Sequence, residues 1–311
     1  MNRLFVLLSL SIILLLAACQ RGTDQSPTSG SLSLVIPEPI EPVLRGEVAA
    51  FLELYRQNGA QISARVGTSE EAIRLFVRDS LRLLFSTRRL TATERALVEK
   101  EGNGLTEIAL AYDGVAVIVQ RDNPIVKATV GEIRGILDGS ITRWEQLSGH
   151  GRFRGAISAI LSDPSDESLY LQQRLFGGAA LHARITRTAS SAQTMHAVAQ
   201  DARAVGFVGI DWLDSLKLPV HPLALAMKDG DADTAYAVPS DAYGRYFATD
   251  PANIYQNSYA FKRTIMMYSR PMQVDLATGF SAYVAGADGQ RLFLRQNLVP
   301  GTQPIRLRPT E

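Results

Sequence analysis

The sequence is poor in the residues that build covalent cross-links and metal sites. Only one of its 311 residues is a cysteine, Cys19, and only four are histidines. A single thiol excludes an intramolecular disulfide. The histidines lie far apart and lack the spacing of metal ligands, so they are interpreted as surface or packing residues. The composition therefore predicts no disulfide framework, no metal site and no cofactor.

An excess of charge of one sign is also missing. The chain has 32 Lys and Arg residues against 31 Asp and Glu residues, a formal net charge of +1, and the two signs are interspersed. Without a basic stripe, nucleic acid is not an expected partner. No nucleophile elbow or phosphate-binding glycine loop is present either. The sequence therefore does not predict an enzyme.

Only one long hydrophobic run occurs, and it lies at the start of the chain. The run from Leu4 to Leu15 has about 12 residues, whereas a transmembrane helix needs about 20. A basic residue, Arg3, precedes it and small residues follow, which is the order of a secretory signal. This pattern allows an ordinary cleaved signal or a short membrane anchor. Alternatively, Leu16 to Cys19 resembles a bacterial lipobox, which predicts a signal peptide over 1–18 and a lipid on Cys19.

A polar segment follows the cysteine. Residues 19–32 are rich in Ser, Thr, Gly and Gln and show no apolar period, so they are predicted to be the lipidated N-terminus and a flexible tether. Residue Gln20 is not the Asp that marks inner-membrane retention in lipoproteins of two-membraned bacteria. By that resemblance, the protein is expected in the cell envelope, facing the periplasm and lipid-anchored, with the outer membrane favoured over the inner.

The rest of the chain alternates short strands with amphipathic helices, a rhythm typical of an α/β fold with mostly parallel sheets covered by helices. Apolar strands are predicted over 32–36, 62–66, 81–85, 108–112, 115–119, 157–161 and 205–208. Helices are predicted to begin at Val43, Ser69, Thr93, Thr129, Ser165 and Ser191, and a helix pair or one broken helix over 281–294. The stretch from about Ser33 to Glu311 is long enough for two lobes of ordinary size.

Several segments, in order, resemble the PstS-like phosphate-binding proteins of ABC transporters. The spacing G-x-I-x-x-W recurs from Gly139 to Trp144, and Ala204 to Gly209 resembles the strand "AIGYVG" of that family. Phe85 to Leu90 with Glu94, Gly289-Gln290 with Val299-Pro300, and Tyr259 to Arg263 resemble further family segments. Trp144 and the glycines are interpreted as turn and core residues that identify the fold and carry no chemistry.

The resemblance implies a two-lobed, periplasmic-binding-protein-like (type II) α/β fold with two hinge crossings and a ligand cleft between the lobes. Lobe one is expected to comprise 33–120 plus 258–311, and lobe two 121–257. The chain is expected to leave lobe one near 119–122 and to return near 259–265. Closure about these crossings would be a hinge motion.

The resemblance also points to the loops that form the cleft. In the family, backbone N–H groups and hydroxyls at helix N-termini bind phosphate together with an arginine, because a helix N-terminus attracts anions. The positions in this chain that correspond to those loops are Glu38, Thr68, Ser69, Ser86, Thr87, Arg88, Ser165, Asp166 and Glu167. The first loop also contains three prolines, which remove N–H donors, and Leu161 stands where the family has its arginine.

The carboxylates in this set allow two interpretations. Asp166 and Glu167 after Ser165 make a stable helix start, since acidic side chains favour the positive end of the helix dipole. Alternatively, they select the ligand. Both interpretations disfavour phosphate, because a carboxylate about 4 Å from a phosphate charge costs several kcal/mol at an effective dielectric near 20. A cationic or hydroxyl-rich solute would fit the acidic rim better.

Two functions therefore remain open. The first is a solute receptor that delivers a small ligand, phosphate by family resemblance, to a membrane permease. The second is an envelope adaptor or structural lipoprotein that keeps the fold, has lost the ligand and acts through protein partners. In both, the lipid on Cys19 is the expected contact with the membrane.

Overall fold

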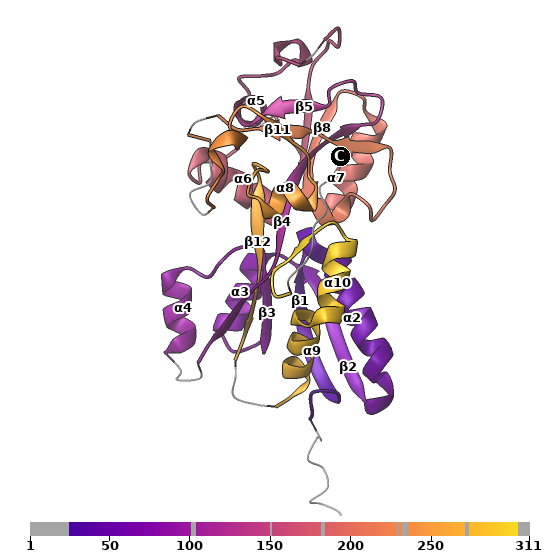
Figure 1. Ribbon diagram of the computed structural model, residues 1–311, viewed down its shortest axis with the longest axis vertical. Helices are drawn as coiled ribbons and strands as arrows, with labels where there is room; N and C mark the ends of the chain where they lie inside the picture. The colour runs from indigo at the N-terminus through magenta and orange to yellow at the C-terminus, as the bar shows by residue number, and fades with distance from the viewer. Residues whose placement is uncertain are drawn as a thin grey trace, which may run out of the picture.

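The computed structural model describes residues 25–100, 104–149, 151–181, 184–228, 230–231, 236–270 and 274–303. These residues form two α/β lobes joined by strands that run between them (Figure 1). The two-lobed α/β prediction is confirmed. The predicted signal peptide (1–18), Cys19 and the first part of the tether lie outside the described residues. Within the described residues, no helix is long and apolar enough to cross a bilayer.

Lobe one is built on a parallel strand pair and helices that cover it. Its elements are β1 (Gly30–Pro37), η1 (Glu38–Ile40), α2 (Glu41–Tyr55), η2 (Arg56–Asn58), β2 (Ala60–Gly67), α3 (Ser69–Val77), β3 (Leu83–Ser86), α4 (Ala92–Glu99), α9 (Leu276–Ala285), α10 (Ala287–Arg295) and β13 (Val299–Pro300). In β1, Leu32 and Leu34 are buried and alternate with exposed serines, as a half-buried strand requires. The strand therefore begins at Gly30, inside the segment predicted to be a tether.

Lobe two lies on the other side of the junction, the region where the two lobes meet. It contains β5 (Lys127–Thr129), α5 (Val130–Asp138), η3 (Trp144–Gln146), β6 (Ser158–Ser162), α6 (Asp166–Phe176), β7 (Thr186–Thr188), α7 (Ser191–Gln200), β8 (Ala204–Gly209), η4 (Ile210–Trp212), β9 (Val220–Pro222), β10 (Ala224–Ala226), η5 (Ser240–Ala242), β11 (Tyr246–Phe247) and α8 (Pro251–Tyr255). Trp144 is buried and donates its indole N–H to the carbonyl of Arg203 at 3.0 Å. Its predicted role as a core residue fits this position.

Two strands connect the lobes, β4 (Thr106–Gln120) and β12 (Lys262–Ser269), and they run antiparallel. Residues of β4 up to Gly114 pair with β12, and those from Val115 onward pair with β8. The pairing partner thus changes before 119–122, where the sequence places the crossing. Because β12 pairs antiparallel with β3 and β4, and β4 pairs antiparallel with β8, the sheets are not mostly parallel as expected.

The predicted break at Asp113-Gly114 does not occur. An Asp-Gly pair is a common hairpin signal, but here β4 continues through it without interruption. Asp113 faces Arg263 in the register of β12 and forms an ion pair with it. A Cβ on Gly114 would lie 3.0 Å from the carbonyl oxygen of Phe261, so the glycine permits close packing of the crossing segments.

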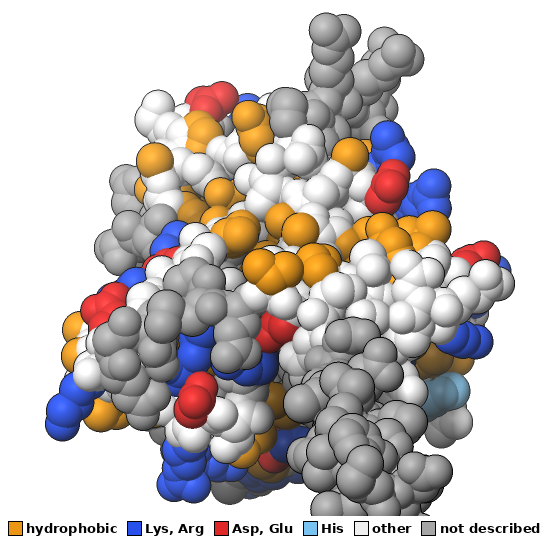
Figure 2. Space-filling model, turned by 90° about the horizontal axis from the view of Figure 1, so that it is seen from below, with side chains coloured by type: hydrophobic (Ala, Val, Ile, Leu, Met, Phe, Trp, Pro, Cys, Tyr) orange, Lys and Arg blue, Asp and Glu red, His pale blue; other side chains and the backbone are white. Residues whose placement is uncertain are grey.

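The far end of lobe one has a mixed surface. Figure 2 views this end and shows hydrophobic side chains in a band across the face, with Lys and Arg side chains to either side. Exposed apolar side chains of lobe one include Leu54, Leu97 and Val274. The polar cluster described next lies at the other end of this lobe, at the junction.

Candidate functional site

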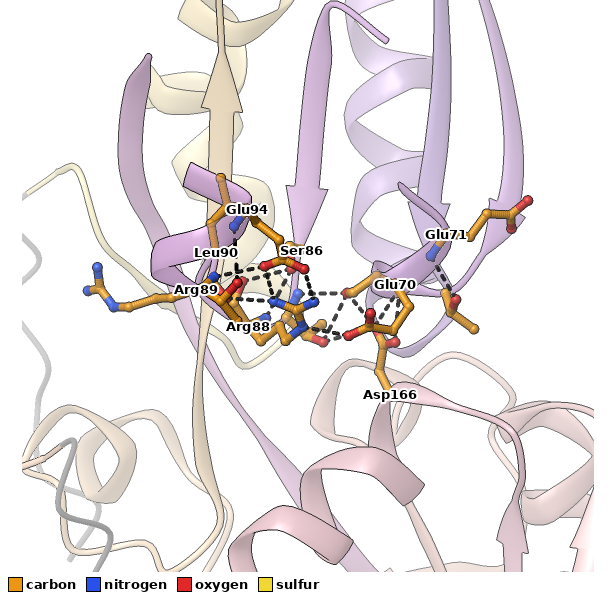
Figure 3. Close-up of polar contacts among 12 residues, drawn as sticks. Glu70, Glu71, Ser86, Arg88, Arg89, Leu90, Glu94 and Asp166 are labelled. Carbon is orange, nitrogen blue, oxygen red and sulfur yellow. Dashed lines mark hydrogen bonds and ion pairs between the residues drawn. The ribbon is translucent and has the colours of Figure 1, made fainter. Parts of the chain in front are cut away.

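The N-terminus of α3 holds a carboxylate from the opposite lobe. Asp166, the first residue of α6, accepts hydrogen bonds from the backbone N–H of Ser69 at 2.9 Å and from its hydroxyl at 2.5 Å. The hydroxyl of Thr87, after β3, donates to the same carboxylate at 2.9 Å. All three side chains are buried. Figure 3 shows Asp166 extending from its own lobe to the one that carries Glu70 and Arg88.

A second carboxylate crosses the junction in the other direction. Glu38, in η1 of lobe one, accepts hydrogen bonds from the backbone N–H of Ser191 at 2.7 Å and from its hydroxyl at 2.8 Å. Ser191 is the first residue of α7 in lobe two. Burial raises the pKa of Glu38 above its ordinary value, although the two hydrogen bonds from Ser191 lower it. The two carboxylates thus occupy helix N-termini reciprocally.

A third contact of this kind ties α2 to lobe two. The buried Asp211 in η4 accepts a hydrogen bond from the backbone N–H of Val43 in the first turn of α2 at 2.8 Å. Burial raises the pKa of Asp211 well above its ordinary value. Three helix N-termini at the junction therefore receive a carboxylate from the other lobe, as expected from their positive dipole ends and free N–H groups.

Behind these contacts lies a buried charged cluster. Glu167 is completely buried, and neither of its carboxylate oxygens has a hydrogen-bond partner among the described residues. Burial, together with the nearby charges of Glu38 and Asp166, raises the pKa of Glu167 to about 8, although Arg263 acts in the opposite direction. Glu167 is therefore mostly protonated at neutral pH.

Arg263 supplies the positive charge of this cluster. It forms a buried ion pair with Asp113 through Nη2, whereas its Nε and Nη1 have no hydrogen-bond partner among the described residues. Burial disfavours its charged form, but Asp113 and Glu167 outweigh this effect and raise the pKa of Arg263. The guanidinium thus stays charged and balances part of the acidic charge at the junction.

Arg88, the arginine expected to face the cleft, is used within lobe one. Its Nε donates to Glu70 at 2.7 Å, and its Nη1 and Nη2 donate to Glu94 at 2.9 and 2.8 Å (Figure 3). The arginine lowers the pKa of Glu94 to about 2. Two carboxylates therefore already neutralise this guanidinium, which leaves it little capacity to neutralise a bound anion.

The remaining predicted residues have local structural roles. The helix α3 begins at Ser69, as predicted, and its cap is Thr68, whose hydroxyl accepts from the N–H of Glu71 at 3.1 Å. The Ser86 hydroxyl donates to the carbonyl of Arg88 at 2.7 Å. Ser165 caps α6 as predicted. The structure thus brings Ser69, Thr87 and Asp166 into direct contact and leaves Thr68, Ser86 and Ser165 in turns and caps beside them.

The lobes also meet without charges. A Cβ on Gly209, at the end of β8, would lie 2.4 Å from the carbonyl oxygen of Pro39 in η1, so only glycine allows this approach. The Trp212 indole donates to the carbonyl of Glu38 at 3.0 Å. Beside the contact of Asp166 with Ser69 and Thr87 lies a half-open groove of about 460 Å³. Its lining includes Arg88, Asp166, Leu169 and Tyr170.

Sequence reasoning missed Ser191, Asp211 and the pair Asp113–Arg263. The pair had a readable signal, because a charged residue within an apolar strand such as 108–119 needs a partner. Ser191 had none, since its partner Glu38 lies 153 positions away. Among the described residues, no group of three or more His, Cys, Asp and Glu side chains is placed to hold a metal ion.

Comparison with known proteins assigns this chain to a family. Residues 23–288 match the model of the PBP superfamily domain. The phosphate-binding protein PstS of Pseudomonas aeruginosa strain PAO1 is 21% identical over 88% of this chain and 84% of its own length. PstS 2 of Streptococcus pneumoniae strain TIGR4 is 36% identical, but over only 17% of this chain and 18% of its own length.

Solved structures share the fold. A substrate-binding protein from Clostridium perfringens, solved with bound phosphate, superimposes with a TM-score of 0.68 at 20% identity. The alignment covers 87% of this chain and 99% of that one. At this identity the likeness concerns the fold, while the family match spans most of the chain. The chain therefore belongs to the PBP superfamily and is similar to PstS phosphate-binding proteins.

Proposed function

We propose that the protein is a solute-binding protein of the cell envelope whose interlobe site departs from one built for phosphate. The observation that supports this is the carboxylate of Asp166 on the donors of Ser69 and Thr87. A phosphate needs the same kind of donors, namely N–H and hydroxyl groups at a helix N-terminus. An external anion and Asp166 cannot use them together, so the two compete.

Electrostatics add to this competition. Two unit charges 4 Å apart repel by about 4 kcal/mol at an effective dielectric of about 20, whereas one hydrogen bond contributes only about 1 kcal/mol net. A phosphate beside Asp166 would also meet Glu38, and Arg88 is already paired with Glu70 and Glu94. We therefore expect a cationic or hydroxyl-rich solute to suit this junction better than phosphate.

The proposed setting follows from the relatives and from the sequence. The similar proteins are named phosphate-binding proteins, and one solved neighbour is an ABC-type phosphate transport receptor from Vibrio cholerae. We propose the same setting for this chain: binding without catalysis, an ABC permease as partner, and a lipid on Cys19 as anchor, with the outer membrane favoured. We also propose lobes of 33–120 plus 258–311 and 121–257.

One observation favours the second candidate, an envelope adaptor that acts through protein partners. Contacts between the lobes are made by the chain's own side chains, from Asp166, Glu38 and Asp211. A fold closed in this way needs no solute to present a fixed surface. Outer-membrane anchoring would also suit an adaptor, because a permease sits in the inner membrane.

Calorimetry of the purified full chain separates these possibilities. Phosphate, sulfate, divalent cations, primary amines and polyols are titrated in turn. A dissociation constant for phosphate in the micromolar range or below would overturn the departure from the phosphate site. Binding of an amine or polyol supports the receptor. If no titrant binds and a specific partner co-purifies from membranes, the adaptor replaces the receptor.

A further inference from the structure

The reciprocal contacts at the junction carry an inference that rests on the proposed function and concerns the control of the same site. We propose that Asp166 and Glu38 are built-in ligands that hold the two lobes closed and that Asp166 denies the N-terminus of α3 to external oxyanions. Each carboxylate extends from one lobe and takes the N–H and hydroxyl of the first helical residue in the other.

The symmetry of the two contacts supports a joint role. Asp166 reaches Ser69 from lobe two to lobe one, and Glu38 reaches Ser191 from lobe one to lobe two. In both pairs the serine is the first residue of the helix and donates through N–H and Oγ, at distances of 2.5 to 2.9 Å. Charge-assisted hydrogen bonds of this length are among the stronger ones in proteins. Opening the cleft would break all four.

These carboxylates are not needed for helix capping. The N-terminus of α3 already has a cap in Thr68, and that of α7 has one in Ser190, whose side chain accepts from the N–H of Gln193. Asp166 and Glu38 therefore satisfy donors that local caps leave free. Their geometry is that of a bound anion, supplied here by the opposite lobe.

The buried groups behind the contacts show that the junction is built around charge. The unpartnered carboxyl of Glu167 and the Nε and Nη1 of Arg263 are fully enclosed between the lobes. Burying such groups without partners costs free energy, and the hydrogen bonds of Asp166 and Glu38 across the junction offset part of this cost. The closure is therefore an arrangement of polar groups across the junction and not only apolar packing.

A distance measurement tests the closure. Spin labels are attached at Leu97→Cys on α4 and at Val126→Cys in lobe two, both exposed, in a Cys19→Ser background. Pulsed dipolar spectroscopy then compares the parent with the double variant Glu38→Gln and Asp166→Asn. We expect a narrow distribution in the parent and a longer, broader one in the double variant. An unchanged distribution in the double variant overturns the proposal.

A matched control removes a carboxylate that does not cross the junction. Glu132 lies at the N-terminus of α5 and accepts from the N–H groups of Thr129 and Ser148, all in lobe two. Glu132→Gln is expected to leave the distance distribution as in the parent. If it shifts the distribution as far as the double variant does, the effect comes from lost stability, and the proposal fails.

A second variant keeps every charge and opens the lobes by size. Gly209→Ala adds a methyl group that would clash with the carbonyl oxygen of Pro39. We expect the labels to move apart in this variant as well, with the circular dichroism spectrum of the folded chain retained. If the double variant fails to fold, this variant decides: an unchanged distribution in it overturns the closure.

The exclusion of oxyanions has its own readout. Asp166→Gly leaves Ser69 and Thr87 without their acceptor, so phosphate and sulfate are expected to bind at least about tenfold more tightly than to the parent. Equal affinity in both proteins overturns this part of the proposal. Tight phosphate binding by the parent would refute the proposed function, whereas the distance measurement would still decide whether the carboxylates hold the lobes.

Discussion

In three helices that begin at the junction, N–H groups of the first turn bind carboxylates from the opposite lobe. In two helices that begin elsewhere, the N–H of the cap residue binds a carboxylate from the same helix. The helix α4 begins with a capping box between Thr91 and Glu94, and α5 with one between Thr129 and Glu132. Both boxes lie within about one turn of sequence. The helices α2, α3 and α7 instead take carboxylates from the opposite lobe. Local carboxylates stabilise a helix, whereas crossing ones join two bodies.

The largest expected effect comes from removing the positive charge of the junction. Arg263→Met leaves Asp113 buried without its partner, and breaking such a pair costs about 3 to 5 kcal/mol in the free energy of unfolding. Urea denaturation measures this change. The matched control is Arg291→Met, which removes an exposed ion pair with Asp288 and is expected to cost at most about 1 kcal/mol. Equal losses would contradict the special character of the junction.

An intermediate effect is expected from the protonated carboxyl of Glu167. Its pKa is about 8 in the folded protein against 4.5 ordinarily, so between these values the folded state holds a proton that the unfolded state releases. This contribution to the free energy of unfolding is present below pH 4.5 and is lost as pH rises through about 8, by up to about 1.4 kcal/mol per pH unit. Glu167→Gln removes this slope.

Urea denaturation at pH values from 5 to 8 measures the pH dependence of the free energy of unfolding. Glu47 provides a comparison away from the junction. This buried residue of α2 has no hydrogen-bond partner among the described residues for either carboxylate oxygen, and burial raises its pKa to about 8. Glu47→Gln is expected to flatten the pH dependence similarly, but away from the junction. A variant Glu167→Gln with the parent's full slope would show that Glu167 is ionised in the folded state.

The smallest effect is expected from a local cap. Thr129→Ala removes the hydroxyl that accepts from the N–H of Glu132, and lost caps typically cost about 1 kcal/mol. Calorimetric melting should show a modest loss of stability, with the spacing between the lobes unchanged. A change in that spacing comparable to that of the crossing carboxylates would remove the distinction between the two classes of helix.

The sequence could predict what depends on neighbours in the chain. The caps of α5 and α6, Thr129 and Ser165, follow from residue type and spacing, and the two-lobed fold follows from motifs in family order. The resemblance places Asp166 in the same expected cleft as Ser69 and Thr87, but residue patterns could not predict its hydrogen bonds, because these partners lie 97 and 79 positions away. Its place at the start of α6 suited a local role equally well.

Arg88 and Asp113 also show that the sequence does not reveal which partner a charged side chain finds. Arg88 lines the groove beside Asp166, but Glu94, six positions on, and Glu70 bind its guanidinium within lobe one. Asp113, followed by a glycine, has the pattern of a turn, and only the pairing of β4 with β12 gives it Arg263 as a partner. Residue patterns thus identify polar groups that need partners, while the fold selects which partners they find.

The continuous strand β4 has a consequence for how the molecule comes apart. One half of this strand completes the sheet of lobe one and the other half that of lobe two. If either lobe unfolds, half of the strand loses its hydrogen-bonding neighbours, and the sheet that remains folded has an unpaired strand end. The two lobes are therefore built to unfold as one cooperative unit, even though they can move apart as two.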